Sequence, residues 1–258
     1  MIISIINQKG GVGKSTTANA LGAGLSLRGY KVLYIDLDAQ GNLSYSMNVL
    51  VKNNMTSSMD VLMNEARDVP SIKTAIVHTK QGDIVPAAPA LARADLMIEI
   101  VEYTLKHAIE PIRDEYDVII IDTPPALGTL TVNALTASDS AIVPAQADAY
   151  SLQGIGMLHQ TVAAVREYSN KRLKINGILI TRYSPRAILT RQMTKLLEDT
   201  AAALHTVVYQ TKIRECIAMK EAQAAQQNIF EYAPKSNASI DYNAFIDELL
   251  KQQPIERK

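Results

Sequence analysis

The sequence is poor in cysteine and lacks long apolar runs, and both absences limit the classes of protein that it can encode. Cys216 is the single cysteine among 258 residues, which excludes an intrachain disulfide and a CxxC metal pair. Polar residues interrupt every apolar run before it reaches the ~20 residues of a membrane span. The first residues also lack the basic segment of a cleavable signal. We therefore expect a cytoplasmic protein with no membrane anchor.

Histidine and net charge are scarce as well. The four histidines are scattered without the spacing of metal ligands, so we expect no histidine-rich metal site. Lys plus Arg number 26 and Asp plus Glu number 26, so the formal net charge is zero. This balance argues against a wholly basic surface that coats nucleic acid, but it permits a local basic patch.

Short apolar runs alternate with longer helical stretches along the chain. Several runs are apolar at consecutive positions, as in "DVIIID" and "INGILIT", which is typical of strands covered on both faces. The predicted strands are Ile2–Ile6, Lys31–Asp36, Asp83–Pro86, Val118–Asp122, Ala141–Pro144, Ile175–Thr181 and Thr206–Tyr209. The predicted helices include Thr16–Arg28, Leu91–Arg113, Gly154–Tyr168 and Thr190–Leu204.

This alternation predicts an α/β fold with a doubly wound, mostly parallel sheet flanked by helices. Residues Asn53–Asp83 are the least regular and indicate surface loops and short helices. There is no repeat, no low-complexity tract and no linker rich in Pro, Gly or Ser, so we expect a single domain over residues 1–258.

The stretch "QKGGVGKST", Gln8 to Thr16, follows the first apolar run and leads into a predicted helix. It matches the phosphate-loop pattern G-x-x-x-x-G-K-[ST] except at Gln8, where glycine is expected. Glycines let successive backbone N–H groups turn toward a phosphate, and the positive end of the helix adds to the attraction. Lys14 can then neutralise the outer phosphates, and the Ser15 hydroxyl can bind Mg²⁺. The pattern leaves the other lysine, Lys9, unexplained.

A phosphate loop needs a carboxylate to hold its metal ion, usually at the end of a nearby apolar strand. "YDVIIIDTPP" supplies Asp122, and "KVLYIDLDAQGN" supplies Asp36 and Asp38. Each of the three could instead cap a helix or a turn. Because ligands bind at the carboxyl ends of the strands in a doubly wound sheet, carboxylates at two such ends favour a nucleotide site.

Together, "KGGVGKST", "DLDAQGN" and "YDVIIIDTPPALGTLTVNALTASDSAIVPAQ" resemble the motifs of the ParA/Soj family of partition ATPases, within the larger ParA–MinD group. The resemblance is dense from Met1 to about Gln153 and looser, but continuous, to about Leu250. The family's phosphate loop is of the deviant Walker A type, K-G-G-x-G-K-[ST], which explains the missing first glycine. The resemblance implies a P-loop ATPase that uses Mg²⁺, takes ATP as its substrate and dimerises with ATP bound, in the service of DNA partition.

The resemblance also implies roles for the matching residues. In the catalytic set, Lys9 would reach across the dimer to the partner's ATP, Lys14 would bind the β- and γ-phosphates, and Asp38 would position the attacking water. Ser15 would bind Mg²⁺, and Asp122 would hold it through water, with Asp38 as a further candidate. No glutamate occupies a general-base position in these motifs, so catalysis should rest on placement and be slow.

The nucleotide-binding set that the resemblance implies combines the phosphate loop with one residue from later in the chain. Its members are Lys9, Gly10, Gly11, Val12, Gly13, Lys14, Ser15, Thr16 and Arg214. Arg214 lies in "TKIRECIAMKEA", which aligns with the adenine-side loop of the family but departs from its usual wording. Glu215 and Cys216 are further candidates for contact with the base.

Partition ATPases of this family bind DNA without sequence preference as ATP dimers, and a ParB-like centromere-binding protein stimulates their hydrolysis. The resemblance therefore implies association with the nucleoid when ATP is bound. The main DNA-binding candidates are Arg182, Arg186, Arg191 and Lys195, with Lys212, Arg214 and Lys220 as others. Arg186 falls where the family often has a DNA-contacting arginine, but Ala218 occupies a second such position. An ordinary solvated basic face is the alternative.

Two other functions stay open. A MinD-like positioning ATPase, acting on a membrane or a secretion machine, would carry a basic amphipathic helix at its C-terminus. The segment "SIDYNAFIDELLKQQPIERK" instead contains Asp241, Asp247 and Glu248 and meets Pro254 early, so we expect its helix to pack on the domain. A metabolic ATP-dependent ligase or kinase on the same fold is the third candidate, although no motif indicates its small-molecule pocket.

Overall fold

The computed structural model describes residues 1–52, 55–63, 72–185, 188–203 and 205–258. Within them, seven strands form one sheet in the order β3-β4-β2-β5-β1-β6-β7. The strands are β1 (Ile2–Ile5), β2 (Val32–Asp36), β3 (Val77–Thr79), β4 (Gly82–Val85), β5 (Val118–Asp122), β6 (Ser140–Gln146) and β7 (Lys174–Thr181). All neighbouring strands are parallel except β3 and β4, which form an antiparallel hairpin at one edge. The mostly parallel sheet predicted from the sequence is confirmed.

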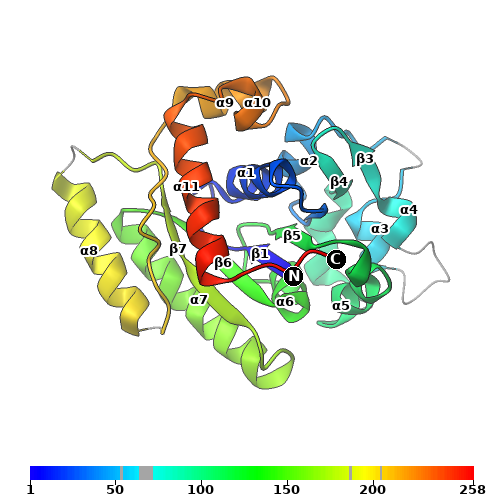
Figure 1. Cartoon of the computed structure of the whole chain (residues 1–258). Helices are drawn as coiled ribbons and strands as arrows, with labels where there is room; N and C mark the ends of the chain where they lie inside the picture. Colours follow the sequence, from blue (N-terminus) through cyan, green and yellow to red (C-terminus); the bar gives the residue numbers. More distant parts are fainter. Residues whose placement is uncertain (53–54, 64–71, 186–187, 204) are drawn as a thin grey trace.

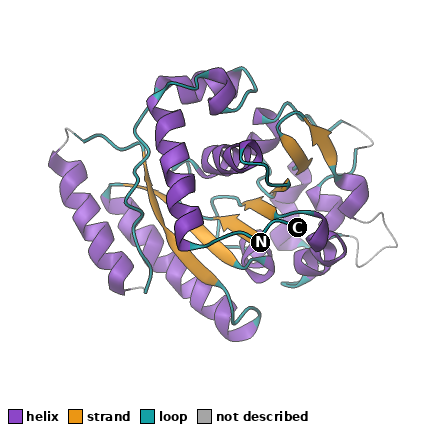
Figure 2. Cartoon of the chain, in the orientation of Figure 1, coloured by secondary structure: helices purple, strands orange, loops and turns teal. Residues whose placement is uncertain are grey.

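Helices cover both faces of this sheet (Figure 1 and Figure 2). Those described are α1 (Lys14–Leu27), α2 (Asn42–Ser46), α3 (Ser58–Leu62), α4 (Ile72–Ala75), η2 (Pro89–Leu96), α5 (Thr104–Ile109), η3 (Glu110–Glu115), α6 (Thr129–Ala137), α7 (Ala149–Tyr168), α8 (Ile188–Ala203), α9 (Ile217–Ala224), α10 (Ile229–Tyr232) and α11 (Asn237–Gln252). One core joins the sheet to α1 and α9–α11, and a second joins it to α3–α6. This is the doubly wound arrangement.

The central strands take part in both cores, which explains their unbroken apolar runs. All five residues of β5 are buried. Val118 and Ile120 face the core shared with α1, whereas Ile119 and Ile121 face the core shared with α5 and α6. Because successive side chains of a strand point to opposite faces, a strand covered on both sides needs apolar residues at consecutive positions.

Three segments differ from the prediction. Leu91–Arg113 is not one helix: it spans parts of η2, α5 and η3, and residues 97–103 between η2 and α5 are not helical. Pro111, which has no N–H group to continue a helical ladder, accounts only for the change from α5 to η3. Thr206–Tyr209 is not a strand: only Val208 forms an isolated bridge with the neighbouring β7. β3 lies in a region predicted to hold loops and short helices, and none of its residues is buried, so its sequence lacks the alternation of a half-buried strand.

The C-terminal helix α11 packs on α1, as the sequence predicts. Tyr242 and Ile246 of α11 are buried in the core that α1 shares, and the Tyr242 hydroxyl lies 3.1 Å from Thr17 Oγ1. Asp247 of α11 pairs with Arg28 at the end of α1, with an oxygen–nitrogen distance of 2.7 Å. Among the described residues, no helix combines the length and the apolar character that a membrane crossing requires.

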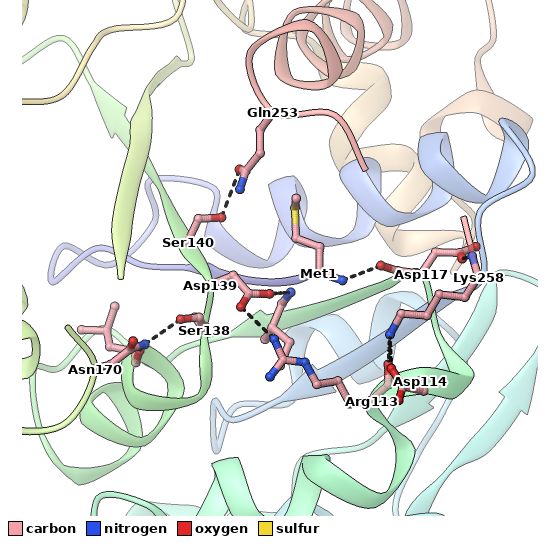
Figure 3. A network of polar contacts seen from close by, with 12 residues as sticks. Met1, Arg113, Asp114, Asp117, Ser138, Asp139, Ser140, Asn170, Gln253 and Lys258 are labelled. Atoms are coloured by element: carbon pink, nitrogen blue, oxygen red, sulfur yellow. Dashed lines mark hydrogen bonds and ion pairs between the residues drawn. The ribbon is translucent and has the colours of Figure 1, made fainter. Parts of the chain in front are cut away.

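Met1 and Lys258 meet at the amino edge of the sheet, opposite the end where the phosphate loop leaves β1 (Figure 3). The Met1 ammonium donates to the Asp117 carbonyl at 2.7 Å, and the backbone N–H of Lys258 donates to the Asp117 carboxylate at 2.5 Å. Beside them, Arg113 pairs with Asp139 at 2.9 Å. These contacts fix the start of β1 and therefore the strand from which the loop emerges.

Gly22 of α1 lies where the helix approaches the sheet most closely, and a Cβ there would overlap the ring of Tyr34 from β2. Tyr34 is fully buried, so its ring has no free space to move into. We expect Gly22→Ala to lower the free energy of unfolding by about 1–3 kcal/mol, the usual cost of overpacking a core. Urea denaturation measures this change.

The matched control is Gly156→Ala in α7, where an added Cβ meets no atom within 4 Å. This change should be neutral or should stabilise the protein by about 0.5–1 kcal/mol, since alanine is the better helix former. An unchanged denaturation midpoint for Gly22→Ala would show that α1 can move away from the sheet at no cost.

Candidate functional site

The loop between β1 and α1 has the backbone of an anion-binding site. Gly11 and Gly13 have φ angles of 73° and 90°, which side chains other than glycine rarely tolerate. Gly13 precedes α1, and no side chain caps the first turn of that helix. The free N–H groups and the positive end of a 14-residue helix are therefore available to an anion such as a phosphate.

The loop lines a pocket of about 670 Å³. Besides Gly10–Thr16, lining residues come from two further segments, 38–46 and 213–224, which are called the two walls below. Asp38 and Arg214 are among the lining residues, so the structure brings together most of the predicted nucleotide-binding set in one cavity. Pockets of this size accommodate a cofactor-sized ligand.

Asp122 is the most unusual group near the loop. It is fully buried at the end of β5, and within the described residues neither carboxylate oxygen forms a hydrogen bond of normal geometry, although the Ser15 hydroxyl lies near enough to favour the charged form. Burial raises the pKa of Asp122 well above its ordinary value, and the neighbouring Asp36 raises it further, whereas Ser15 and Lys14 lower it in part. A cation beside these oxygens would satisfy them. The hydroxyl of Ser15 and one carboxylate are the kind of oxygen ligands that Mg²⁺ accepts when phosphates and water complete its shell.

Asp36 and Asp38 follow the same strand but have different surroundings. Asp36 is buried and accepts hydrogen bonds from Ser44 N and Oγ, at 2.9 and 2.7 Å, and from Asp38 N at 3.1 Å. Burial raises the pKa of Asp36 to about 6, although these hydrogen bonds lower it in part. Asp38 instead lines the pocket and accepts from Gln40 N at 3.0 Å. Asp36 therefore organises the loop that carries Asp38.

The two lysines of the loop point to different places. Lys14 is buried in the pocket, with its ammonium 3.3 Å from the Lys9 carbonyl oxygen. Burial lowers the pKa of Lys14, and the charges of Asp122 and Asp38 oppose that shift. Lys9 forms an ion pair with Asp148, the N-cap residue of α7, and its ammonium lies 5.9 Å from the ring centre of Tyr150. Lys9 is thus not a lining residue of the pocket in its own chain.

The predicted adenine-side residues lie at the pocket, but Arg214 is already engaged. Its guanidinium binds the Asp241 carboxylate of α11, with Nη2 2.6 Å and Nε 2.9 Å from the oxygens. Glu215 and Cys216 line the pocket beside it, and Cys216 is half-buried at the start of α9. The contact of Arg214 with a base therefore stays a prediction.

The DNA-binding candidates do not form one patch. Arg191 and Lys195 are exposed on α8, four residues apart and so on one helix face, at the outer end of the sheet in Figure 1. Arg182 and Lys220 line the pocket instead, and the Lys212 ammonium lies 5.8 Å from the ring centre of Tyr183. Arg186 lies outside the described residues.

Sequence reasoning missed several polar residues that hold the loop in place. Asn7 donates to the Pro144 carbonyl at 2.7 Å and accepts from Lys9 N at 2.9 Å. Thr181 Oγ1 donates to the Val12 carbonyl at 2.8 Å, and Gln223 donates to Thr16 Oγ1 at 2.7 Å. Asn7 could have been suspected, since it directly follows a buried strand and precedes the loop. The others are far from the motif in sequence and give no local signal.

Comparisons with known proteins agree with this geometry. A family model described as an AAA domain matches residues 1–175. The chain is 39% identical over 246 residues to the sporulation initiation inhibitor protein Soj of Bacillus subtilis, covering 93% of this chain and 94% of Soj. It is 35% identical over 258 residues to the chromosome partitioning protein ParA of Caulobacter vibrioides, covering 98% and 94%.

A solved structure is also similar over nearly the whole chain. It is described as cobyrinic acid a,c-diamide synthase from Mycobacterium smegmatis with bound ADP and magnesium. The TM-score is 0.82 at 33% identity, and the match covers 97% of this chain and 94% of that chain.

The buried carboxylate of Asp122 makes a prediction about stability without ligands. Since the pKa of Asp122 in the folded state lies above 3.8, its ordinary value, the folded state binds more protons than the unfolded chain above that pH. The free energy of unfolding therefore falls as the pH rises through this window. Asp122→Asn removes the charge, so at pH 8 with a chelator it should stabilise the protein by about 1–3 kcal/mol.

At about pH 4, where unfolded aspartates are half protonated, the variant and the parent should become similar in stability. Asp199→Asn, an exposed change on α8, is the control and should stay within about 0.5 kcal/mol of the parent. If Asp122→Asn destabilised the protein equally at both pH values, the carboxylate would be a structural hydrogen-bonding group rather than an unsatisfied one.

Proposed function

Because the chain belongs to the ParA/Soj family of P-loop ATPases, we propose that it is a Mg²⁺- and ATP-dependent dimerising ATPase that partitions DNA. The cargo would be a plasmid, a chromosome or a mobile element, and residues 1–258 would act as one ATPase domain. The similarity to Soj and ParA supports the class. The observation that carries the proposal is the different placement of two lysines in one phosphate loop. Lys14 lies inside the pocket, and Lys9 lies outside it beside α7.

The pocket residues have roles that follow from their positions. The backbone of Gly10–Thr16 would hold the phosphates, with Lys14 neutralising the β- and γ-phosphates. Ser15 would bind Mg²⁺ directly and Asp122 would hold it through water. When bound there, Mg²⁺ would supply positive charge that offsets the negative charge developing on the phosphates during transfer. Asp38, which lines the pocket, would position the attacking water, with a water-mediated contact to the metal as a further role.

This arrangement favours slow hydrolysis. The lining residues that come from residues 38–46 include Asp38, Gln40 and Asn42 but no glutamate. Catalysis would then rest on positioning and charge neutralisation. Slow hydrolysis of this kind would set how long a dimer stays assembled.

Lys9 would connect ATP binding to dimerisation. In this chain its ammonium is held by Asp148, and the side chain of Lys9 is 27% exposed, so it can be released without breaking a core contact. An ammonium placed on the partner's triphosphate at a shared, partly dry interface would be attracted much more strongly than one in water. ATP would thereby favour the dimer, and hydrolysis would weaken it.

The dimer would bind DNA through phosphate contacts, with Arg191 and Lys195 on α8 as the exposed candidates that do not line the pocket. Two copies would double the number of contacts, which act together through counterion release. A ParB-like protein that binds the centromere would stimulate hydrolysis. We expect the protein to act in the cytoplasm and to associate with the nucleoid when ATP is bound, as its likeness to Soj and ParA supports.

A MinD-like membrane function receives less support from the geometry. A membrane-targeting helix must present an apolar face to lipid, whereas the apolar face of α11 is buried against α1. Its acidic residues would also face anionic headgroups. Flotation with anionic liposomes, with and without ATP, distinguishes this function from DNA partition.

The likeness to the M. smegmatis structure favours a second candidate, an ATP-dependent amide synthase. Both candidates need the same phosphate loop, so the geometry of the site does not distinguish between them. They differ in what stimulates ATP use: DNA with a ParB-like protein for partition, and a carboxylic acid substrate with an amide nitrogen donor for synthesis. ATP turnover measured with each set separates the two.

Lys9→Ala should leave ATP binding intact but abolish the ATP-induced dimer, because Lys9 does not line its own pocket. Sedimentation with Mg²⁺ and a non-hydrolysable ATP analogue, together with a fluorescent-nucleotide titration, tests both parts. We expect Kd for nucleotide to change by less than about threefold, since no direct contact is lost. Dimers that persist in the Lys9→Ala variant would contradict the proposed role.

Arg191→Ala/Lys195→Ala should weaken ATP-dependent DNA binding and make it less sensitive to salt. If all four positive charges of a dimer contact phosphates, the slope of log K against log salt should flatten by about 3–4. The control Lys171→Ala/Arg172→Ala removes the same charge types from the exposed turn between α7 and β7. An equal effect of both variants would indicate that DNA responds to the overall positive charge of the surface rather than to a binding site on α8.

A further inference from the structure

Gln81 is a buried polar residue in a position where polar residues are usually exposed. It occupies the two-residue turn of the β3–β4 hairpin, because Thr79 pairs with Gly82 on either side of it. Its neighbour Lys80 is exposed, whereas Gln81 is only 8% exposed. Gln81 N–H donates to Thr79 Oγ1 at 3.0 Å, and Gly82 adopts a φ of 119°. The turn therefore fixes the side chain of Gln81 in a direction that leads into the protein.

The side-chain amide of Gln81 joins three separate elements. Its Nε2 donates to the Ser46 carbonyl at the end of α2, at 3.1 Å, and to the Gln226 carbonyl after α9, at 3.0 Å. Its Oε1 accepts from Asn19 Nδ2 of α1 at 3.3 Å. One amide thus uses both of its N–H groups and its oxygen on three partners that lie far apart in sequence.

Two of these elements are walls of the pocket. Tyr45 and Ser46 of α2 line one wall, and Gln223 and Ala224 of α9 line the other. The third element, α1, is the helix that begins directly after the phosphate loop.

A second hydrogen bond links the same two walls. Gln226 Nε2 donates to the Tyr45 carbonyl at 3.2 Å, and Gln226 itself has a φ of 54°. The segment that follows α9 is therefore linked to α2 in two ways: through the side chain of Gln81, and through the side chain of Gln226 itself.

We propose that Gln81 is a positioning residue that sets the spacing of the two walls and so determines the affinity for the base and ribose of the nucleotide. This inference rests on the proposed function, in which ATP occupies the pocket. Loss of the amide would leave the buried Ser46 carbonyl and the part-buried Gln226 carbonyl without their donor, and such groups are costly unless the structure opens to water. Opening would separate α2 from α9, while the phosphate loop keeps its own backbone geometry.

The test compares ATP with inorganic tripolyphosphate, which carries the same phosphates without base or ribose. Gln81→Met keeps the size of the side chain and removes its hydrogen bonds. With Mg²⁺ present, we expect Kd for ATP to rise about tenfold, the effect of losing roughly one buried hydrogen bond. Kd for tripolyphosphate should stay within about twofold, because the phosphate loop is unchanged. Lys80→Ala, an exposed change in the same turn, should alter neither affinity.

The ratio of the two dissociation constants separates positioning from general destabilisation. If Gln81→Met weakened ATP and tripolyphosphate by the same factor, or weakened neither, the proposal would be overturned. A parent protein that binds neither ligand would instead contradict the proposed function.

Should Gln81→Met fail to fold, Gln226→Gly provides the second variant. It removes only the side-chain link to Tyr45, and glycine tolerates the positive φ of this position. We expect a smaller change in the same direction, with Kd for ATP about threefold higher and tripolyphosphate binding retained. Unchanged ATP affinity in this variant would also overturn the proposal.

Discussion

The site depends on one electrostatic constraint: a fully buried carboxylate, Asp122, that forms no hydrogen bond of normal geometry with the described residues and that the nearby Ser15 hydroxyl stabilises only in part. Asp122 ends a strand that is apolar on both faces, so water cannot solvate it from either core. Asp36 lies beside it in register on β2 and adds a like charge. The neighbouring Lys14 offsets these charges only in part, because burial also disfavours its own charged form. A divalent cation with a phosphate is the kind of ligand that would balance the whole group.

The fold and the loop were predictable because both leave local signals in the sequence. A strand buried on two faces must be apolar at consecutive positions, as in β5, and a phosphate loop must place glycines, lysine and hydroxyl at fixed spacing. The failures have the same explanation. β3 is short and without a buried residue, and residues 91–113 have apolar spacing but also contain Pro111, so propensity and pattern disagree there.

The contacts that hold the site in place were not predictable, because each joins distant segments. Lys9 and Asp148 are 139 residues apart, and Gln81 and Gln226 are 145 apart. A single lysine, aspartate or glutamine shows no periodicity that would identify its partner. Arg214 shows the same limit: the motif placed it correctly at the pocket, but only the structure shows Asp241 of α11 holding its guanidinium.

The Lys9–Asp148 ion pair is weak enough that Lys9 can be bound by Asp148 and still be released to bind another anion. The two side chains are 27% and 31% exposed, and exposed pairs of this kind contribute about 0–1 kcal/mol. Asp148 also accepts from Ser151 N at 2.9 Å, so it remains bonded as the N-cap of α7 when Lys9 leaves. Release of Lys9 therefore costs little, because Asp148 keeps its bond from Ser151 and both side chains are partly open to water. In the dimer that we propose, a triphosphate on a second copy would need to offer only slightly more than Asp148 does. Occupancy of the pocket, rather than rearrangement of the fold, would then be the step that decides whether two copies associate.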